Sequence, residues 1–259
     1  MISGMAEFKL SKWYLDCVGE SGDASIIYAG AARWGPVRLR YSSLLESAAG
    51  AVSTRYSLRA GEPTLAAGAL RWSSVPLRAD GEWLADSTEI RETLFASEAG
   101  RIEWRCLMPR ARARIGNLAG LGYAERLEMT VAPWKLPLRT LRWGRFASAA
   151  DWLVWIAWGG EFPRAWVYRN GREVRASSIE DDGIELDDGA RLILDRSLVL
   201  RQGPLGSTAL SAIPGIRETV PLRLLQVDEC KWRSRARLER TGEPPVEGWA
   251  IHERVEWPA

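Results

Sequence analysis

The residues of this 259-residue chain that are best placed for chemistry are two glutamates at the same position of a repeated motif. Glu125 lies within Gly122–Arg126, and Glu253 lies within Ala250–Arg254, where each is followed directly by an arginine. Successive side chains of a β-strand point to opposite faces, so both glutamates share a face with apolar neighbours. We therefore expect both carboxyl groups on the inner face of a barrel, where burial favours the neutral form.

Two interpretations of these glutamates follow from that position. A protonated carboxyl group in a dry pocket is a general acid that can protonate an alkene or a carbonyl group. The alternative is a structural ion pair, in which Glu125 and Glu253 each bind an inward arginine under a tryptophan and close a barrel. The structural interpretation is favoured, because a duplicated fold keeps structural devices in both copies, whereas activity generally resides in one place. Both residues remain candidates for catalysis.

The aromatic composition points to a large apolar surface, since the chain has 14 tryptophans and only 4 phenylalanines. Five tryptophans cluster in one region: Trp143, Trp152, Trp155, Trp158 and Trp166. Such faces shape a pocket for an extended apolar ligand and stabilise a developing cation, or they simply fill small barrel cores. On a strand, Trp152 and Trp158 share one face and Trp155 takes the other, so they do not all line one pocket. The predicted substrate-binding residues are Tyr41, Tyr123, Trp143, Trp155 and Trp158.

Metal and cofactor chemistry has little support in the sequence. The three cysteines, Cys17, Cys106 and Cys230, form no CxxC pair, and His252 is the only histidine. Neither a thiolate metal site, a multi-histidine site nor a disulfide framework is predicted, and no cofactor is expected. His252 falls on the strand face opposite Glu253, which predicts a solvated or interfacial side chain rather than a catalytic one.

Charge and hydropathy also exclude several partners. The 35 Lys and Arg residues nearly balance the 33 Asp and Glu residues, and there is no basic run, so nucleic-acid binding is not expected. The longest apolar stretch, Trp152–Gly160, is far shorter than the roughly 20 residues that a membrane-spanning helix needs. Met1–Leu10 lacks the apolar region of a secretory signal, so we expect a cytoplasmic protein. The oligomeric state is left open.

An internal duplication must position these residues. Trp104 and Trp232 are separated by the same 128 positions as Glu125 and Glu253 (232 − 104 and 253 − 125), and segments between them match in order. A weaker match relates residues 23–28 to residues 151–156 at the same offset. The proline-containing segment 132–140 is the expected joint. We predict two domains, residues 1–135 and 136–259.

Each half reads as β-structure. Strands are predicted at residues 38–41, 166–168, 190–200 and 223–227, between four turn signals: Asp80-Gly81, Asn170-Gly171, Asp182-Gly183 and Asp188-Gly189. Residues 43–51 are expected to form a short helix, and residues 87–95 are ambiguous. Because so few helices are available to cover a sheet, each half is expected to close on itself. The predicted fold is all-β, with two tandem antiparallel β-barrels related by internal duplication.

Three segments, residues 122–126, 133–137 and 141–146, resemble the middle of the hydroxyneurosporene synthase-like proteins, also called carotenoid hydratase or AttH-like proteins. The resemblance implies two lipocalin-like barrels. It also implies a hydrophobic small-molecule substrate, since the family includes hydratases of carotenoid double bonds and lipocalin-like Diels–Alderases that fold polyene-bearing polyketides. No family catalytic carboxylate is matched residue by residue.

The leading hypothesis is a cofactor-independent cyclase of natural-product biosynthesis, which holds a polyene or polyketide for a Diels–Alder-type cycloaddition. Its pocket would include Tyr123, Glu125, Trp143, Trp155 and Glu253. One alternative is a hydratase or isomerase that uses Glu125 or Glu253 as a proton donor. Another is a non-catalytic carrier of a hydrophobic molecule.

Overall fold

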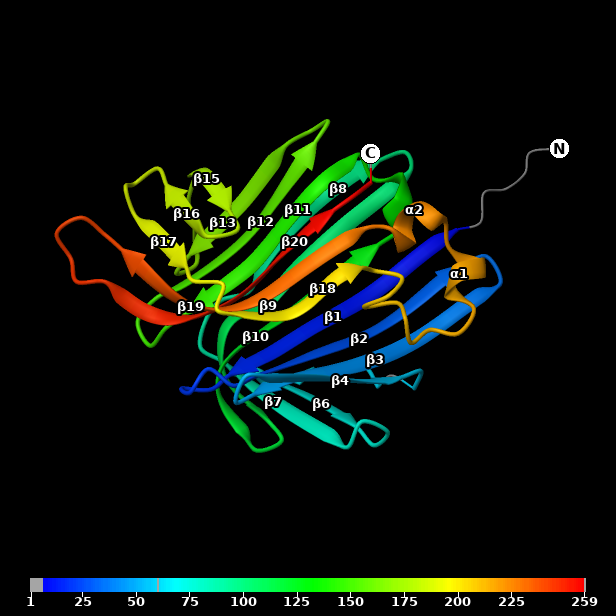
Figure 1. Cartoon of the computed structure of the whole chain (residues 1–259), viewed down its shortest axis with the longest axis horizontal. Coiled ribbons are helices and arrows are strands. Elements are labelled where there is room, and N and C mark those ends of the chain that lie inside the picture. Colours follow the sequence, from blue (N-terminus) through cyan, green and yellow to red (C-terminus); the bar gives the residue numbers. More distant parts are fainter. Residues whose placement is uncertain (1–6, 60, 259) are drawn as a thin grey trace. The chain divides into compact units, whose positions relative to one another are not determined.

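The structure is a computed structural model that describes residues 7–59 and 61–258. The chain forms two compact units, each built around an antiparallel sheet of ten strands (Figure 1). Apart from Glu20–Gly22, which group with the second unit, the first unit extends to Leu136 and the second begins at Pro137. None of the helices in the described ranges is long and apolar enough to cross a lipid bilayer.

The first unit contains strands β1 to β10. Their bounds are β1 Phe8–Val18, β2 Ala24–Trp34, β3 Val37–Ala48, β4 Ala51–Ser57, β5 Thr64–Ala66, β6 Ala69–Ser74, β7 Ala79–Ala85, β8 Ile90–Ser97, β9 Gly100–Ile115 and β10 Leu118–Met129. The hydrogen-bonded order is β4-β3-β2-β1-β10-β9-β7-β6-β5, and β8 also pairs with β9. The short 3-10 helix η1, Pro133–Lys135, follows β10.

The second unit repeats this topology. Its elements are β11 Leu138–Ala147, β12 Trp152–Gly160, β13 Arg164–Arg169, β14 Arg172–Glu173, β15 Ala176–Glu180, β16 Gly183–Leu186, β17 Arg191–Leu194, β18 Leu198–Pro204, α1 Ile216–Thr219, α2 Leu222–Leu225, β19 Asp228–Glu239 and β20 Val246–Glu256. The order is β14-β13-β12-β11-β20-β19-β17-β16-β15, with β18 paired to β19. Strand for strand, the two orders correspond, so the predicted all-β fold and its internal duplication are confirmed.

The strand register defines which residues of the two units are equivalent. Glu125 pairs with Tyr14 of β1, and Glu253 pairs with Trp143 of β11, which places both glutamates at the same point of the repeat. The tryptophans do not follow this offset, because Trp104 pairs with Leu127, whereas Trp232 pairs with His252. Register shifts between β9 and β10 near residue 124 displace Trp104 along its strand. The matched spacing of the two tryptophans is therefore not a structural equivalence.

Several local predictions are wrong. Residues 43–48 continue strand β3 rather than starting a helix, because they pair with both β2 and β4. Residues 223–227 do not form a strand, since helix α2 covers their first part. Asp80-Gly81 lies inside β7 and not at a turn, whereas the other three Asn-Gly and Asp-Gly pairs do lie at turns. The ambiguous segment 87–95 contains the start of β8.

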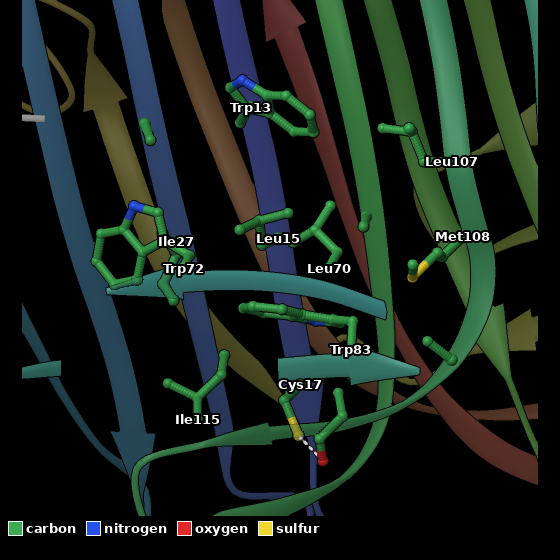
Figure 2. Close-up of a cluster of buried hydrophobic side chains, with 14 of the residues drawn as sticks. Trp13, Leu15, Cys17, Ile27, Leu70, Trp72, Trp83, Leu107, Met108 and Ile115 are labelled. Atoms are coloured by element: carbon green, nitrogen blue, oxygen red, sulfur yellow. Dashed lines mark hydrogen bonds between the residues drawn. The ribbon is translucent and has the colours of Figure 1, made fainter. Parts of the chain in front are cut away.

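Tryptophans fill much of the core of the first unit. Trp13, Leu15 and Cys17 project from the same face of β1 and pack with Trp72 and Trp83 (Figure 2). The indole N–H of Trp83 donates to the Asp16 carbonyl oxygen at 2.7 Å, which satisfies a polar group that would otherwise be costly to bury. The intervening residues of β1, including Tyr14 and Asp16, point to the opposite face of the sheet.

The core of the second unit is formed by the equivalent face of its sheet. Phe146 of β11, Trp155 of β12, Val167 of β13 and Ala250 of β20 are among its buried members. In both units the central strands are also buried on the other face. Apolar and aromatic side chains therefore occur on both faces, which makes the inner face hard to recognise from alternation alone.

Candidate functional site

Glu125 lies on the sheet face opposite the core of the first unit. Its neighbour Ala124 belongs to the core cluster, so Glu125 must point the other way. The expectation that the two glutamates line the inside of a barrel is therefore wrong, and the same holds for Glu253, because Ala250 and Trp155 define the core side of its sheet. The error has a physical cause. Because β1, β2 and β10 are buried on both faces, apolar neighbours such as those of Glu125 do not identify the inner face of the barrel.

Glu125 is nevertheless only 8% exposed and accepts two short hydrogen bonds. The indole N–H of Trp104 and the hydroxyl of Tyr123 both donate to its Oε2 atom, each at 2.6 Å. Burial raises the pKa of Tyr123 well above its ordinary value, with further contributions from Cys106 and Glu125. Tyr123 is therefore a neutral phenol, and Glu125 fixes the direction in which it donates.

A continuous set of aromatic side chains extends from this carboxyl group across β1 and β2. The ring of Tyr14 lies 5.9 Å from that of Tyr123 and 5.2 Å from that of Tyr28, both in edge-to-face geometry. Lys12 Nζ lies 5.1 Å from the centre of the Tyr28 ring, a cation–π distance. These contacts bring together residues of the consecutive strands β1 and β2 and of β10, which is distant from them in the sequence.

Tyr41 of β3 adds the outer end of this set. It pairs with Gly30, which in turn pairs with Lys12, so Tyr41 and Lys12 lie on the same face. A Cβ atom at Gly30 would approach Tyr41 Cε1 to 3.0 Å, which shows that the ring lies over the glycine. We call this set the tyrosine cluster, and its members are Lys12, Tyr14, Tyr28, Tyr41, Trp104, Tyr123 and Glu125.

The tyrosine cluster combines aromatic rings and hydrogen-bond donors with the Glu125 carboxyl group, and the buried Asp16 carboxyl group beside it accepts the Tyr14 hydroxyl at 3.1 Å. Tyr14, Tyr28 and Tyr123 are buried, whereas the half-buried Lys12 ammonium and Tyr41 hydroxyl can donate to a carbonyl oxygen of a ligand. Cys106, which pairs with Glu125, is fully buried, and burial raises its pKa well above the ordinary value. It is therefore a thiol rather than a nucleophilic thiolate.

The repeated glutamate of the second unit has a different setting. Lys231 occupies the position opposite Glu253 that Cys106 occupies opposite Glu125, and its fully buried ammonium forms an ion pair with the Glu253 carboxylate. Lys231 Nζ also lies 5.0 Å from the centre of the Trp143 ring. The glutamate is thus held under a tryptophan by a lysine, and not by an arginine. This arrangement fits a structural role for Glu253.

The structure does not bring the other predicted pocket residues together on one surface. Trp143 and Trp158 share the Glu253 face of the second unit, and Trp158 stacks edge-to-face on Trp166 at 5.5 Å. Trp155 lies on the core face, where Gly144 makes room for its ring. Of the seven predicted residues, only Tyr41, Tyr123 and Glu125 belong to the tyrosine cluster.

His252 is neither solvated nor at the surface, and the expectation from the sequence is wrong. It is 3% exposed on the core face of β20, where its Nε2 atom lies 2.8 Å from Ser234 Oγ and its ring stacks on Trp232 at 5.1 Å. Burial, followed by the nearby Lys231 charge, lowers its pKa to about 3. The imidazole is neutral near neutral pH. The face opposite Glu253 is the barrel interior, which explains the burial.

Sequence reasoning missed four members of the cluster, Lys12, Tyr14, Tyr28 and Trp104. Four of the chain's six tyrosines belong to the tyrosine cluster, so residue type alone gave some indication of it. Only the register of β1, β2 and β10 places these side chains on one face of the sheet. Within the described ranges there is no group of three or more His, Cys, Asp or Glu side chains arranged to hold a metal ion.

Comparisons with known proteins bear on the fold. No family model matches the chain, and no curated protein matches it. Among solved structures, CghA with Sch210972 is 12% identical, with 96% of this chain and 88% of that chain covered and a TM-score of 0.57; CghA alone gives 0.58 over the same shares. Kievitone hydratase from Nectria haematococca is 11% identical over 97% of this chain and 89% of its own, with a TM-score of 0.49. The likeness to CghA confirms the lipocalin-like double-barrel fold that the sequence resemblance implied.

Proposed function

We propose, from the tyrosine cluster and the lipocalin-like double-barrel fold shared with CghA, that this protein is a cofactor-independent cyclase of a polyene- or polyketide-derived small molecule. The observation that carries the proposal is the unbroken run of ring contacts from Tyr123 through Tyr14 and Tyr28 to Lys12. Tyr123, Tyr14 and Tyr28 are buried, so an extended conjugated ligand reaches this run over the half-buried Lys12 and Tyr41, which bind its carbonyl group. The cycloaddition of a diene with an activated alkene needs little more than a fixed chain geometry and a hydrogen bond to the carbonyl group of the alkene.

The rate enhancement has two sources in this account. Packing against the rings holds the diene and the alkene close together, and a productive fixed geometry can lower a barrier by several kcal/mol. Donation from Lys12 or Tyr41 to the carbonyl oxygen withdraws electron density from the alkene and favours the transition state. Glu125 is a positioning residue, because it directs the Tyr123 hydroxyl and the Trp104 indole rather than reaching a substrate.

The hydratase alternative receives less support from the two glutamates. Glu253 is engaged in an ion pair with a buried ammonium, and breaking such a pair costs several kcal/mol. Glu125 already accepts two hydrogen bonds at one oxygen, from Trp104 and Tyr123. Both carboxyl groups are thus held by neighbouring side chains, which favours a positioning or structural role over proton donation to a ligand.

The test is the conversion of a linear trienone, whose diene and enone can close to a bicyclic ketone, followed by chromatography against the uncatalysed reaction. The wild-type protein should accelerate closure. Lys12→Met and Tyr41→Phe should each lower the rate by about tenfold or more, the effect expected for a hydrogen bond to a developing charge. Tyr56→Phe is the matched control, because Tyr56 of β4 is an exposed tyrosine of the same unit, and its rate should not change.

The three hypotheses give different results with the same reagents. A hydratase would add water to the trienone instead of closing it, and Glu125→Gln would abolish that product. A carrier would bind a neutral polyene such as retinol, seen as quenching of tryptophan fluorescence, and would leave the trienone unchanged. Closure that is equally fast in the wild-type, Lys12→Met and Tyr41→Phe proteins would contradict the proposed role of the tyrosine cluster.

A further inference from the structure

Strand β4 lies at one end of the sheet of the first unit, where one of its two backbone edges faces away from that sheet. All seven of its residues pair with β3, and none of the other described strands pairs with it. Five of the seven residues are exposed, and none is buried. A strand edge of this kind offers a row of N–H and C=O groups to another strand.

The second unit protects the equivalent edge. The counterpart of β4 in its strand order is β14, which consists of only two residues, Arg172 and Glu173, both of them charged. Short edge strands and edge charges are common means of preventing a sheet from pairing with another chain. Strand β4 has instead a single charge, Arg55, which already forms an ion pair with Glu46 of β3 at 2.8 Å. On this side of the two sheets, only the first unit has a long edge with little charge.

The turn between β3 and β4 determines which backbone groups of β4 lie on the outer edge. Both turn residues, Ala49 and Gly50, have a positive φ, 48° and 82°, as a two-residue type I′ hairpin turn requires. The residues that flank this turn pair with each other, so the N–H of the first residue of β4 bonds to β3. Backbone groups alternate in direction along an antiparallel strand, and the register of β4 on β3 is unbroken. The N–H and C=O groups on the outer edge are therefore those of Val52, Thr54 and Tyr56.

A second copy of β4 fits this edge in a register that pairs the whole strand. With two antiparallel copies related by a two-fold axis at Thr54, that residue faces the partner's Thr54 and Val52 faces the partner's Tyr56. In this register the outward N–H and C=O groups of the two copies face each other. Thr–Thr pairs and pairs of an aromatic with a β-branched residue are among the cross-strand pairs that stabilise a sheet. Arg55 faces the partner's Ser53, so like charges are not placed opposite each other.

We propose that strand β4 is a self-association edge, through which two copies of this chain form a two-fold symmetric dimer. The partner is a second copy, because the register that pairs the outward backbone groups also pairs the side chains and separates the two arginines. The assembly stops at two chains, since each copy uses the same edge. One strand pair makes a small interface, so the dimer is weak and its population depends on concentration. Dimer formation does not depend on the proposed cyclase activity.

The test is sedimentation equilibrium of the full chain at concentrations up to about 100 µM, as a weak interface requires. The mass of the wild-type protein should rise from that of one chain to that of two. Thr54→Pro should remain monomeric over the whole range, because it removes an outward N–H group. That N–H group is not used in pairing with β3, so proline is tolerated there, and the circular dichroism of the variant should match that of the wild type.

A charge exchange tests the register itself. Thr54→Lys and Thr54→Glu should each be monomeric, because the two-fold axis places like charges directly opposite each other, whereas an equal mixture of both variants should dimerise. Thr64→Lys is the matched control, since Thr64 is an exposed threonine on the three-residue edge strand β5 of the same unit, and this variant should dimerise like the wild type. A monomeric wild type, a dimer that persists in Thr54→Pro, a mixture that stays monomeric, or a monomeric Thr64→Lys chain would overturn the proposal.

Discussion

Replacement of Glu253 by glutamine should destabilise the second unit strongly, because it removes a carboxylate that is ion-paired with the fully buried Lys231 ammonium. Glutamine has nearly the same shape, so packing is preserved and the loss of charge is isolated. Glu253 is 14% exposed in its side chain, and the Trp143 ring remains 5.0 Å from the ammonium. Both features reduce the penalty but do not remove it.

Breaking a buried ion pair by removing one partner costs about 3–5 kcal/mol. The residual exposure of Glu253 and the Trp143 contact place the expected loss near the lower end, at about 3 kcal/mol. That is a large fraction of the total stability of roughly 5–15 kcal/mol typical of a domain. The free energy of unfolding is measured by urea titration, with circular dichroism as the signal.

The control is Glu247→Gln on the same strand. Glu247 pairs with Arg235 at 3.5 Å, but both side chains are more than half exposed, so the loss should not exceed about 0.5 kcal/mol. A second variant, Glu253→Leu combined with Lys231→Met, removes both charges and should recover most of the lost stability. A loss for Glu253→Gln no larger than that for Glu247→Gln, or a double variant no more stable than Glu253→Gln, would contradict a stabilising buried ion pair.

Three further predictions concern buried groups. The pKa of His252 is about 3 in the folded protein and about 6.5 in the unfolded chain. As pH drops below about 6.5, the imidazole therefore binds a proton in the unfolded chain but not in the folded protein, which favours unfolding. Stability should therefore fall by up to about 1.4 kcal/mol per pH unit more steeply between pH 6 and pH 4 in the wild type than in His252→Gln, and equal slopes in urea titrations would contradict this. Gly144→Ala should cost about 1–3 kcal/mol, because the new Cβ would come within 2.2 Å of Trp155 and 2.7 Å of His252; an unchanged urea midpoint would show that the ring can move. Cys17, Cys106 and Cys230 are buried, so a colorimetric thiol reagent should react with the native protein slowly and with all three thiols after unfolding; rapid reaction of a native thiol would be inconsistent with the structure.

Much of the fold could be predicted from the sequence because it depends on local and repeated signals. Asn-Gly and Asp-Gly pairs predicted three turns of the second unit, and the repeated glutamate located the last strand of each unit. Helix α2 was missed because four apolar-rich residues show the same short pattern in a helix as in a strand. Residues 43–48 were misread for the same reason.

The candidate site was only partly predictable, because it depends on register and on which face of a sheet is inside. Alternation correctly separates Trp155 from Trp152 and Trp158 on β12. It does not identify the core face, since Tyr14 and Leu15 are buried on opposite faces of the same strand. Lys12, Tyr14 and Tyr28 become neighbours of Tyr123 only through long-range strand pairing, which a single sequence does not specify.

The same limit explains why two copies of one motif differ in role. The sequence around Glu125 and Glu253 is alike, but the residue opposite each glutamate comes from another strand, Cys106 in one unit and Lys231 in the other. An ion pair therefore forms in the second unit, whereas two neutral donors bind the carboxyl group in the first. Together with the run of ring contacts from Tyr123 to Lys12, this difference supports our proposal of a site in the first unit.

The central claim, that a conjugated ligand binds at the tyrosine cluster, is tested most directly by photolabelling. A polyene alcohol bearing a diazirine group is photolysed with the native protein, and the labelled residues are identified by peptide mass spectrometry. We expect labels within strands β1 to β3, on or beside Lys12, Tyr28 and Tyr41, and their loss when unlabelled retinol is added in excess. Labels confined to the second unit, around Trp155 and His252, would contradict it.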